Sequence, residues 1–150
     1  MYKHILYPTD GSPGSEKAFE HVLKMAVSFE AKVSILHVYQ MALGVTQSFF
    51  RLPPEVREQA LNNLSQDGDD LLKNIKERLL KRKVETLIYN VEGNTKTTIC
   101  EFAIKHQADL IILGTRGAGS RNISGSVNHF GSTCSYLIHH TPGIPVMVID

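Results

Sequence analysis

Short apolar runs alternate with long amphipathic segments along this chain, and no other feature restricts the fold as strongly. The apolar runs have the length of strands and occupy residues 4–7, 32–38, 84–91, 108–113 and 144–149. Between them, apolar residues recur at helical spacing, at 14–30, 55–82, 95–104 and from about 126 to 140. Strands that alternate with helices predict a parallel sheet with right-handed crossovers and helices on both faces. We therefore expect an α/β fold with a doubly wound, five-stranded parallel sheet in a three-layer α/β/α arrangement.

The length and charge narrow the possible classes of function. A chain of 150 residues fits one domain, residues 1–150, and it is long enough to bury a core without disulfides or metals. Lys and Arg number 16 against 15 Asp and Glu, which argues against nucleic acid as the main partner. No apolar run approaches the ~18 residues of a membrane span, and the N-terminus lacks a signal-peptide pattern. We expect a cytoplasmic protein without a membrane partner.

Two segments depart from the regular pattern. Residues 39–54, which contain Phe49, Phe50 and two consecutive prolines, predict a loop. Within the long helix, the run Asp67-Gly68-Asp69-Asp70 lowers the helix propensity and suggests a kink, with the paired carboxylates facing solvent. His37 is interpreted as a structural residue at the end of its strand, and Cys100 and Cys134 as free, packed thiols.

Two loops occupy the positions where such a sheet binds ligands, beyond the carboxyl ends of its strands. One is Pro8-Thr9-Asp10-Gly11-Ser12, and the other begins at Leu113-Gly114-Thr115-Arg116-Gly117. Glycine lets backbone amides approach a phosphate closely, and the N-terminus of the following helix adds to the attraction. The second loop offers many hydroxyl donors, and its arginines could neutralise phosphate charge. These arginines are Arg116 and Arg121.

Motifs of other nucleotide sites and of common enzymes do not fit. Gly114 and Gly119 have the spacing of a phosphate-binding P-loop, but Ser120 stands where that loop needs lysine. No glycine-rich dinucleotide fingerprint follows the first strand, and no nucleophile elbow or catalytic triad order is visible. His139 and His140 are adjacent on a helix and point apart, which disfavours a metal site. The sequence therefore predicts binding, with at most a slow hydrolysis of ATP by positioning and charge neutralisation.

Taken together, these segments resemble the universal stress protein family over nearly the whole chain. The matching segments are Pro8-Thr9-Asp10-Gly11-Ser12, Leu36-His37-Val38, the run from Ala108 to Gly117, and Pro145-Val146-Met147-Val148. Nucleotide-binding members of that family carry G-x2-G-x9-G-[S/T] after the fourth strand. Gly114 and Gly117 match its first half.

The second half of that motif has two candidate matches here. Gly125-Ser126 follows Gly117 after seven residues, and Gly131-Ser132 follows it after thirteen. We prefer Gly131, because its distance to the closing Pro145-Val146 resembles the family's spacing and a longer loop costs little. In the alternative, the last helix starts near Ser126 and contains Gly131, and the phosphate loop ends at Gly125. An apolar stripe favours that alternative, namely Val127, Phe130, Cys134, Leu137 and Ile138.

The resemblance implies a Rossmann-like fold with strand order 3-2-1-4-5, and binding of ATP, or of AMP or ADP, with Mg²⁺ as a frequent companion. Thr9 and Asp10 would lie near the ribose and phosphates, and the backbone at Val38 would meet the adenine. Leu113 and Gly114 would contact the ribose side. The phosphates would be held by Gly117, Gly131, Ser132 and Thr133. Arg116 is a further candidate, not from the resemblance but because its charge could neutralise that of a phosphate.

The resemblance also implies a homodimer that pairs its final strands, and an exposed apolar edge at residues 145–149 gives a physical motive for such pairing. The sequence leaves three functions open. They are an ATP-binding regulator in stress responses, a dimeric interaction module without nucleotide, and a weak ATPase. The lengthened loop after Gly117 favours the second of them.

Overall fold

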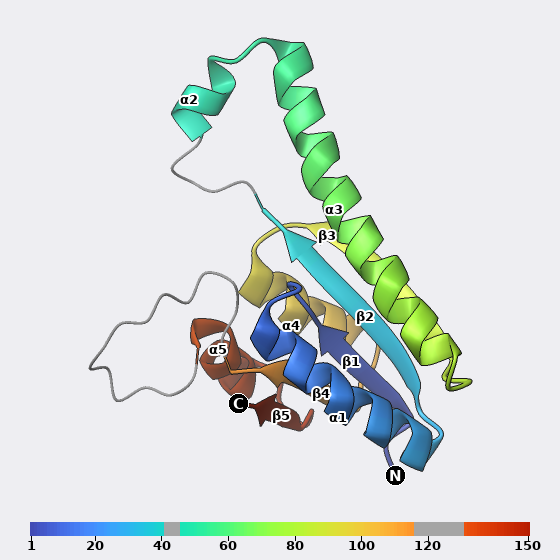
Figure 1. The fold of residues 1–150 in the computed structure, drawn as a ribbon. Helices are drawn as coiled ribbons and strands as arrows, with labels where there is room; N and C mark the ends of the chain where they lie inside the picture. The colour runs from blue at the N-terminus through green and yellow to red at the C-terminus, as the bar shows by residue number, and fades with distance from the viewer. Residues whose placement is uncertain (41–45, 116–130) are drawn as a thin grey trace.

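In the computed structural model, which describes residues 1–40, 46–115 and 131–150, five parallel strands form one sheet in the order β3-β2-β1-β4-β5 (Figure 1). The strands are β1 (His4–Pro8), β2 (Lys32–Tyr39), β3 (Thr86–Glu92), β4 (Leu110–Gly114) and β5 (Val146–Ile149). The predicted doubly wound fold and its strand order are thereby confirmed.

Helices cover both faces of the sheet, as the alternating pattern predicts. On one face lie α1 (Pro13–Phe29) and α3 (Pro54–Leu80), and on the other lie α4 (Thr95–Lys105) and α5 (Ser132–His140) (Figure 1). Helix α1 starts where the sequence indicates, with the Ser12 side chain accepting from the Ser15 amide and Pro13 in the first turn. A short helix, α2 (Thr46–Phe50), precedes α3.

Side chains that alternate along each strand divide the core into two halves. Ile5 and Tyr7 of β1 pack beneath α1 and α3, whereas Leu6 between them packs beneath α4 and α5. All three are 0% exposed. Because a strand in the middle of such a sheet is covered on both faces, its sequence is apolar without alternation. The buried Tyr7 hydroxyl donates to the Ser15 carbonyl at 2.7 Å and so fastens β1 to the first turn of α1.

One local expectation was wrong, because the predicted loop over residues 39–54 contains α2. Helix α3 continues through Asp67-Gly68-Asp69-Asp70 as one helix. Gly68 is buried and faces the sheet, so the residue that weakens the helix locally is the one that lets it pack closely. Tertiary packing therefore outweighs the low helix propensity at this point.

Helix α3 is also joined to α1 by one side chain. Arg78 donates to both carboxylate oxygens of Glu16, and its guanidinium lies 3.9 Å from the centre of the Phe19 ring. Figure 1 shows the N-terminal part of α3 extending beyond the carboxyl end of β2, on the side where ligands bind in folds of this kind.

Candidate functional site

The turn after β1 is held together by its own polar groups. The Thr9 hydroxyl donates to Ser15 Oγ at 3.1 Å and accepts from the Gly11 amide at 3.3 Å. The Ser12 amide donates to Asp10 Oδ1 at 3.0 Å. Gly11 has a φ of +73°, which favours glycine. The Thr9 side chain is therefore buried inside the turn, whereas Asp10 is exposed at the carboxyl edge of the sheet.

The end of β4 lies directly against the start of α1. A Cβ added at Gly114 would be 2.5 Å from the carbonyl carbon and oxygen of Gly14 and 3.0 Å from the Ser15 nitrogen. Only glycine fits such an approach without movement of the backbone. The Leu113 side chain is buried among α4 and α5, so Leu113 can offer a ligand only its backbone. The strand end and the turn after β1 thus border the same space.

Helix α5 begins beside the end of β4. Gly131 is its N-cap residue, and its amide donates to the Thr115 carbonyl at 2.8 Å. Among the described residues no side chain caps this helix, and Thr133 is half-buried whereas Ser132 is exposed. The first-turn amides of a helix have no partner inside the helix, and they attract anions. A helix end of the kind that attracts anions therefore lies at the same edge of the sheet as Asp10.

Part of the predicted phosphate loop lies outside the described residues, namely Arg116, Gly117, Gly125 and Ser126. Gly131 lies at the N-cap of α5, so it is not inside the helix as the alternative reading of the loop requires. The assignment of Gly131-Ser132 to the end of the phosphate loop stays a prediction, because residues 116–130 are not among the described residues.

Strand β2 extends past β1 and leaves part of its edge open. The β1 register ends at Pro8 opposite Leu36, and the Thr9 amide donates to the Leu36 carbonyl at 2.9 Å. The amide and carbonyl of one strand residue point to the same side, and the sides alternate. Those of Val38 therefore point toward the β1 side, like those of Leu36, where the described residues provide no strand partner. Within the described part of the chain, the Val38 amide offers one donor and its carbonyl one acceptor on that side.

A polar cluster lies beside this open edge, on the face covered by α3. The Asn90 carboxamide oxygen is 2.9 Å from His37 Nδ1. Its nitrogen donates to the Ser65 carbonyl at 2.7 Å and to Asp69 Oδ1 at 3.0 Å. His37 is thus held by its neighbours, in keeping with the structural role that the sequence indicates. Asp69, expected to face solvent, is instead partly buried and bonded to Asn90.

Sequence reasoning missed Asn90 and Gly68 as parts of this edge. A Cβ at Gly68 would lie 2.5 Å from His37 Nδ1 and 2.6 Å from Asn90 Oδ1. A glycine in the middle of a long helix was the available signal, because it marks a close approach as often as a weak point. Helix α3 also reaches the turn after β1, where Leu71 lies 3.4 Å from the Cβ position of Gly11.

The cysteines have no features of reactive groups. Cys134 Sγ donates to the Gly114 carbonyl at 3.3 Å, and Cys100 Sγ donates to the His140 carbonyl at 3.0 Å. Burial raises the pKa of both thiols, which disfavours the nucleophilic thiolate. Both are free, as the sequence predicts.

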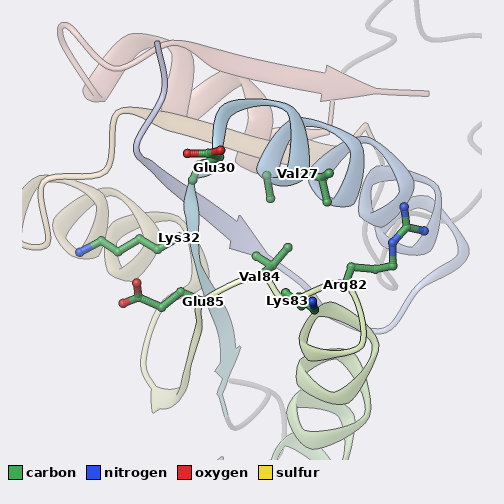
Figure 2. A pocket seen from close by; sticks show the side chains of 9 residues that line it. Val27, Glu30, Lys32, Arg82, Lys83, Val84 and Glu85 are labelled. Carbon is green, nitrogen blue, oxygen red and sulfur yellow. The ribbon is translucent and has the colours of Figure 1, made fainter.

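Away from this edge, the described residues offer no metal site and no membrane-spanning helix, and one hollow that none of the predicted site residues line. Within the part of the chain that the structure describes, no group of three or more His, Cys, Asp or Glu side chains could hold a metal, and no helix is long and apolar enough to cross a membrane. A hollow of about 270 Å³ lies at the opposite edge of the sheet, between the end of α1 and residues 82–85 (Figure 2). None of its lining residues is a predicted site residue.

The family model and the most similar curated proteins that we compared point to one family. The chain matches the universal stress protein family over residues 1–150. It is 34% identical over 118 residues to universal stress protein MJ0531 of Methanocaldococcus jannaschii, covering 78% of this chain and 66% of that protein. It is 30% identical over 146 residues to universal stress protein YxiE of Bacillus subtilis, covering 92% and 99%.

Solved structures show the same fold. The structure of the hypothetical protein MJ0577 superposes with a TM-score of 0.82 at 28% identity, covering 99% of this chain and 96% of that one. A family protein from Arabidopsis thaliana with AMP bound gives 0.66 at 18% identity, covering 98% and 90%. A universal stress protein in complex with cAMP gives 0.70 at 18% identity, covering 99% and 97%. At such identities the last two show the fold alone.

Proposed function

Because the chain belongs to the universal stress protein family, we propose that it is a single-domain regulatory protein that binds an adenine nucleotide at the carboxyl edge of its sheet. ATP is the expected ligand, with AMP or ADP as alternatives and Mg²⁺ as a companion of ATP. Two structural neighbours that carry AMP and cAMP support the nucleotide class. The cytoplasmic location stays a prediction from the sequence.

The observation that carries the proposal is the open edge of β2 at Val38. Adenine presents an acceptor at N1 beside a donor at N6, and guanine presents the opposite pair there. One backbone amide with one backbone carbonyl matches the adenine pair when the amide faces N1 and the carbonyl faces N6. A hydrogen-bonding site strongly rejects a ligand that leaves its buried groups unpaired. We therefore expect adenine to be preferred over guanine.

The remaining parts of a nucleotide would meet groups of the right chemistry. The start of α5, at Gly131, Ser132 and Thr133, offers amides and hydroxyls to phosphates. Asp10 is exposed beside the end of β1, where a carboxylate can accept from ribose hydroxyls. The close packing of Gly114 on α1 keeps these two regions adjacent. Arg116 and Gly117 stay predictions from the sequence motif.

Isothermal titration calorimetry with AMP, ADP, ATP and GMP, with and without Mg²⁺, tests the proposal. We expect adenine nucleotides to bind and GMP to bind at least about tenfold more weakly, a difference of ~1.4 kcal/mol. Gly117→Val should weaken binding of ATP, because the sequence motif assigns this glycine to the close approach of the phosphates. Absence of heat and of thermal shift with every adenine nucleotide would remove the proposal. Release of phosphate from ATP above the blank, lost in Asp10→Ala, would indicate an ATPase instead.

One observation favours a second function, a dimeric interaction module without nucleotide. The interval between Gly117 and Gly131 is thirteen residues where the family motif has nine. Mass spectrometry of small molecules carried by the purified native protein separates the two functions. An adenine nucleotide in the released fraction supports binding, and its absence together with negative calorimetry supports the module.

A further inference from the structure

Among the described residues, the end of β2 that would bind the base pairs with another strand on one side only. The pairing of β2 with β1 ends at Leu36, whereas its pairing with β3 continues to Tyr39. The last pairs with β3 are His37 with Asn90, Val38 with Val91, and Tyr39 with Glu92. A site that reads hydrogen bonds must hold its groups to within ~0.5 Å of the productive position. Backbone pairing with one strand leaves such an edge free to move, so a further constraint is needed.

We propose that Asn90 is a positioning residue for base recognition, which locks the end of β2 to α3 and so fixes the amide and carbonyl of Val38. This inference rests on the proposed adenine site. Asn90 does not itself meet the base, because its side chain lies on the face of the sheet covered by α3. It acts through His37, the residue that precedes Val38.

Every hydrogen-bonding group of the Asn90 carboxamide has a structural use. Its oxygen accepts from His37 Nδ1, and its two N–H groups have acceptors in Ser65 O and Asp69 Oδ1. Because a carboxamide oxygen can only accept, His37 Nδ1 is the donor in this contact. One side chain on β3 thereby connects β2 to two positions one turn apart on α3.

Gly68 makes this connection possible. It lies between Ser65 and Asp69 on the face of α3 that looks toward the sheet, and it is buried. The Cβ of any other residue would fall 2.5 Å from His37 Nδ1 and 2.6–2.9 Å from the two polar atoms of the Asn90 carboxamide. The helix therefore approaches the two strands as closely as the polar bridge requires.

If Asn90 acts in this way, its loss should affect binding of the base more than binding of the phosphates. Loosening the end of β2 should weaken binding of the base. The amides and hydroxyls of α5 that would bind the phosphates should stay in place, because α5 packs on the other face of the sheet. If the bridge only stabilised the fold, its loss would weaken binding of the base and of the phosphates equally. In a variant that still folds, it would weaken neither.

The test compares three changes at the bridge with a matched control. Asn90→Ala removes the bridge, and Asn90→Asp sets a second carboxylate beside Asp69. The exchange variant Asn90→Asp with Asp69→Asn restores a donor and an acceptor across the 3.0 Å contact. Asp70→Asn is the control, because it removes the same charge one residue away on the exposed side of α3. Thermal unfolding shows which variants fold.

Binding of ADP and of inorganic pyrophosphate, which lacks the base, is then measured for each folded variant. We expect Asn90→Ala and Asn90→Asp to lower the affinity for ADP about tenfold or more and to reduce the preference for ADP over GDP. The affinity for pyrophosphate should change less than about twofold. The exchange variant should recover part of the loss, and the control should match the unaltered protein. Equal loss for ADP and pyrophosphate, or no loss in a folded variant, would overturn the inference.

Amide hydrogen exchange of the nucleotide-free protein provides a second, independent measurement. The amides of His37 and Tyr39 face β3, and we expect them to exchange faster in Asn90→Ala while the amides of β4 are unchanged. If the unaltered protein binds no nucleotide, the proposed function fails by that result alone. Unchanged exchange at His37 and Tyr39 overturns the positioning role whether or not nucleotide binds.

Discussion

The Cβ position of Gly114 lies 2.5 Å from the carbonyl oxygen of Gly14, so the end of β4 touches the backbone of the first turn of α1. This contact brings together the two loops that the sequence indicates as ligand-binding. The end of β4 and the start of α1 belong to segments 100 residues apart in the chain, and the absence of a side chain on one residue decides how closely they meet.

Gly114→Ala is expected to lower the free energy of unfolding by ~1–3 kcal/mol, because the added methyl forces one backbone segment away from the other. Urea unfolding followed by circular dichroism measures the change. Gly143→Ala is the comparison, since it has a φ of +79° but open space around its Cβ position. An unaffected Gly114→Ala protein would show that the contact is not as tight as the structure gives it.

Gly68→Ala tests the contact between α3 and the sheet. In an exposed helix interior, replacing glycine by alanine stabilises by ~1 kcal/mol, through higher helix propensity. Here we expect net destabilisation, because the methyl group would meet His37 and Asn90. Asn63→Ala, at an exposed position of the same helix, should stabilise slightly and serves as the control. A gain in stability for Gly68→Ala would contradict the close approach.

The stability of the fold should depend on pH through His4. Burial, and to a smaller extent Lys32, lower the pKa of His4, while the His106 carbonyl and Asp109 oppose that shift. The unfolded chain, with a histidine pKa of about 6.5, then binds a proton more readily than the folded protein. Stability from this group is fully present above about pH 6.5 and is lost as the pH falls toward the lowered value.

His4→Gln separates this effect from that of the carboxylates. The imidazole is 2.7 Å from Ser34 Oγ and 3.1 Å from the His106 carbonyl, so the variant should be less stable at neutral pH. Between pH 6.5 and 5, its free energy of unfolding should fall less steeply than that of the unaltered protein. Parallel curves from urea titrations at each pH would exclude His4 as the source.

Strand β5 is expected to mediate a homodimer. It is the edge strand next to β4, and all four of its residues are partly exposed. The Ile149 carbonyl accepts from the Thr115 amide, so the amide of Val148 points away from β4. Val148→Pro removes one outward donor without touching the β4 pairing, and light scattering should show a shift from dimer to monomer. A monomeric unaltered protein would refute the expectation.

Both cysteines should resist modification in the folded protein. Cys100 is 8% and Cys134 2% exposed, and burial raises the pKa of each thiol. We expect reaction with a disulfide reagent at pH 8 to be slow in buffer and complete within minutes in denaturant. Rapid labelling of Cys134 alone in buffer would show that the start of α5 opens easily.

The strands were predictable because burial on both faces imposes an apolar run that few other structures need. The start of α1 was predictable for a different reason, since Ser12 and Pro13 act on their own local backbone. The family resemblance supplied the strand order, which the local pattern does not contain. Gly131 is the N-cap residue of α5, and its place at the end of a phosphate loop stays a prediction, because residues 116–130 lie outside the described residues.

The cluster at Asn90 could not be found in the same way. His37 and Asn90 are 53 residues apart in the chain, and Asn90 and Asp69 are 21 apart, so no local pattern connects them. Local propensity was misleading at Gly68, because the cost of glycine in a helix is visible in the sequence and the strands that it approaches are not. The family resemblance assigned the Val38 backbone to the adenine, but no local pattern shows the open edge itself, because that edge depends on how far β2 extends past β1.

The edge at Val38 consists of main-chain atoms, and every amino acid except proline supplies the same amide and carbonyl. Selection for a base at this place would therefore act on the length of β2 and on the register between neighbouring strands, leaving the identity of residue 38 free to vary among β-compatible residues. Relatives could exchange that side chain and retain the same recognition, whereas a single deletion within β2 would reverse the side to which the donor and acceptor point.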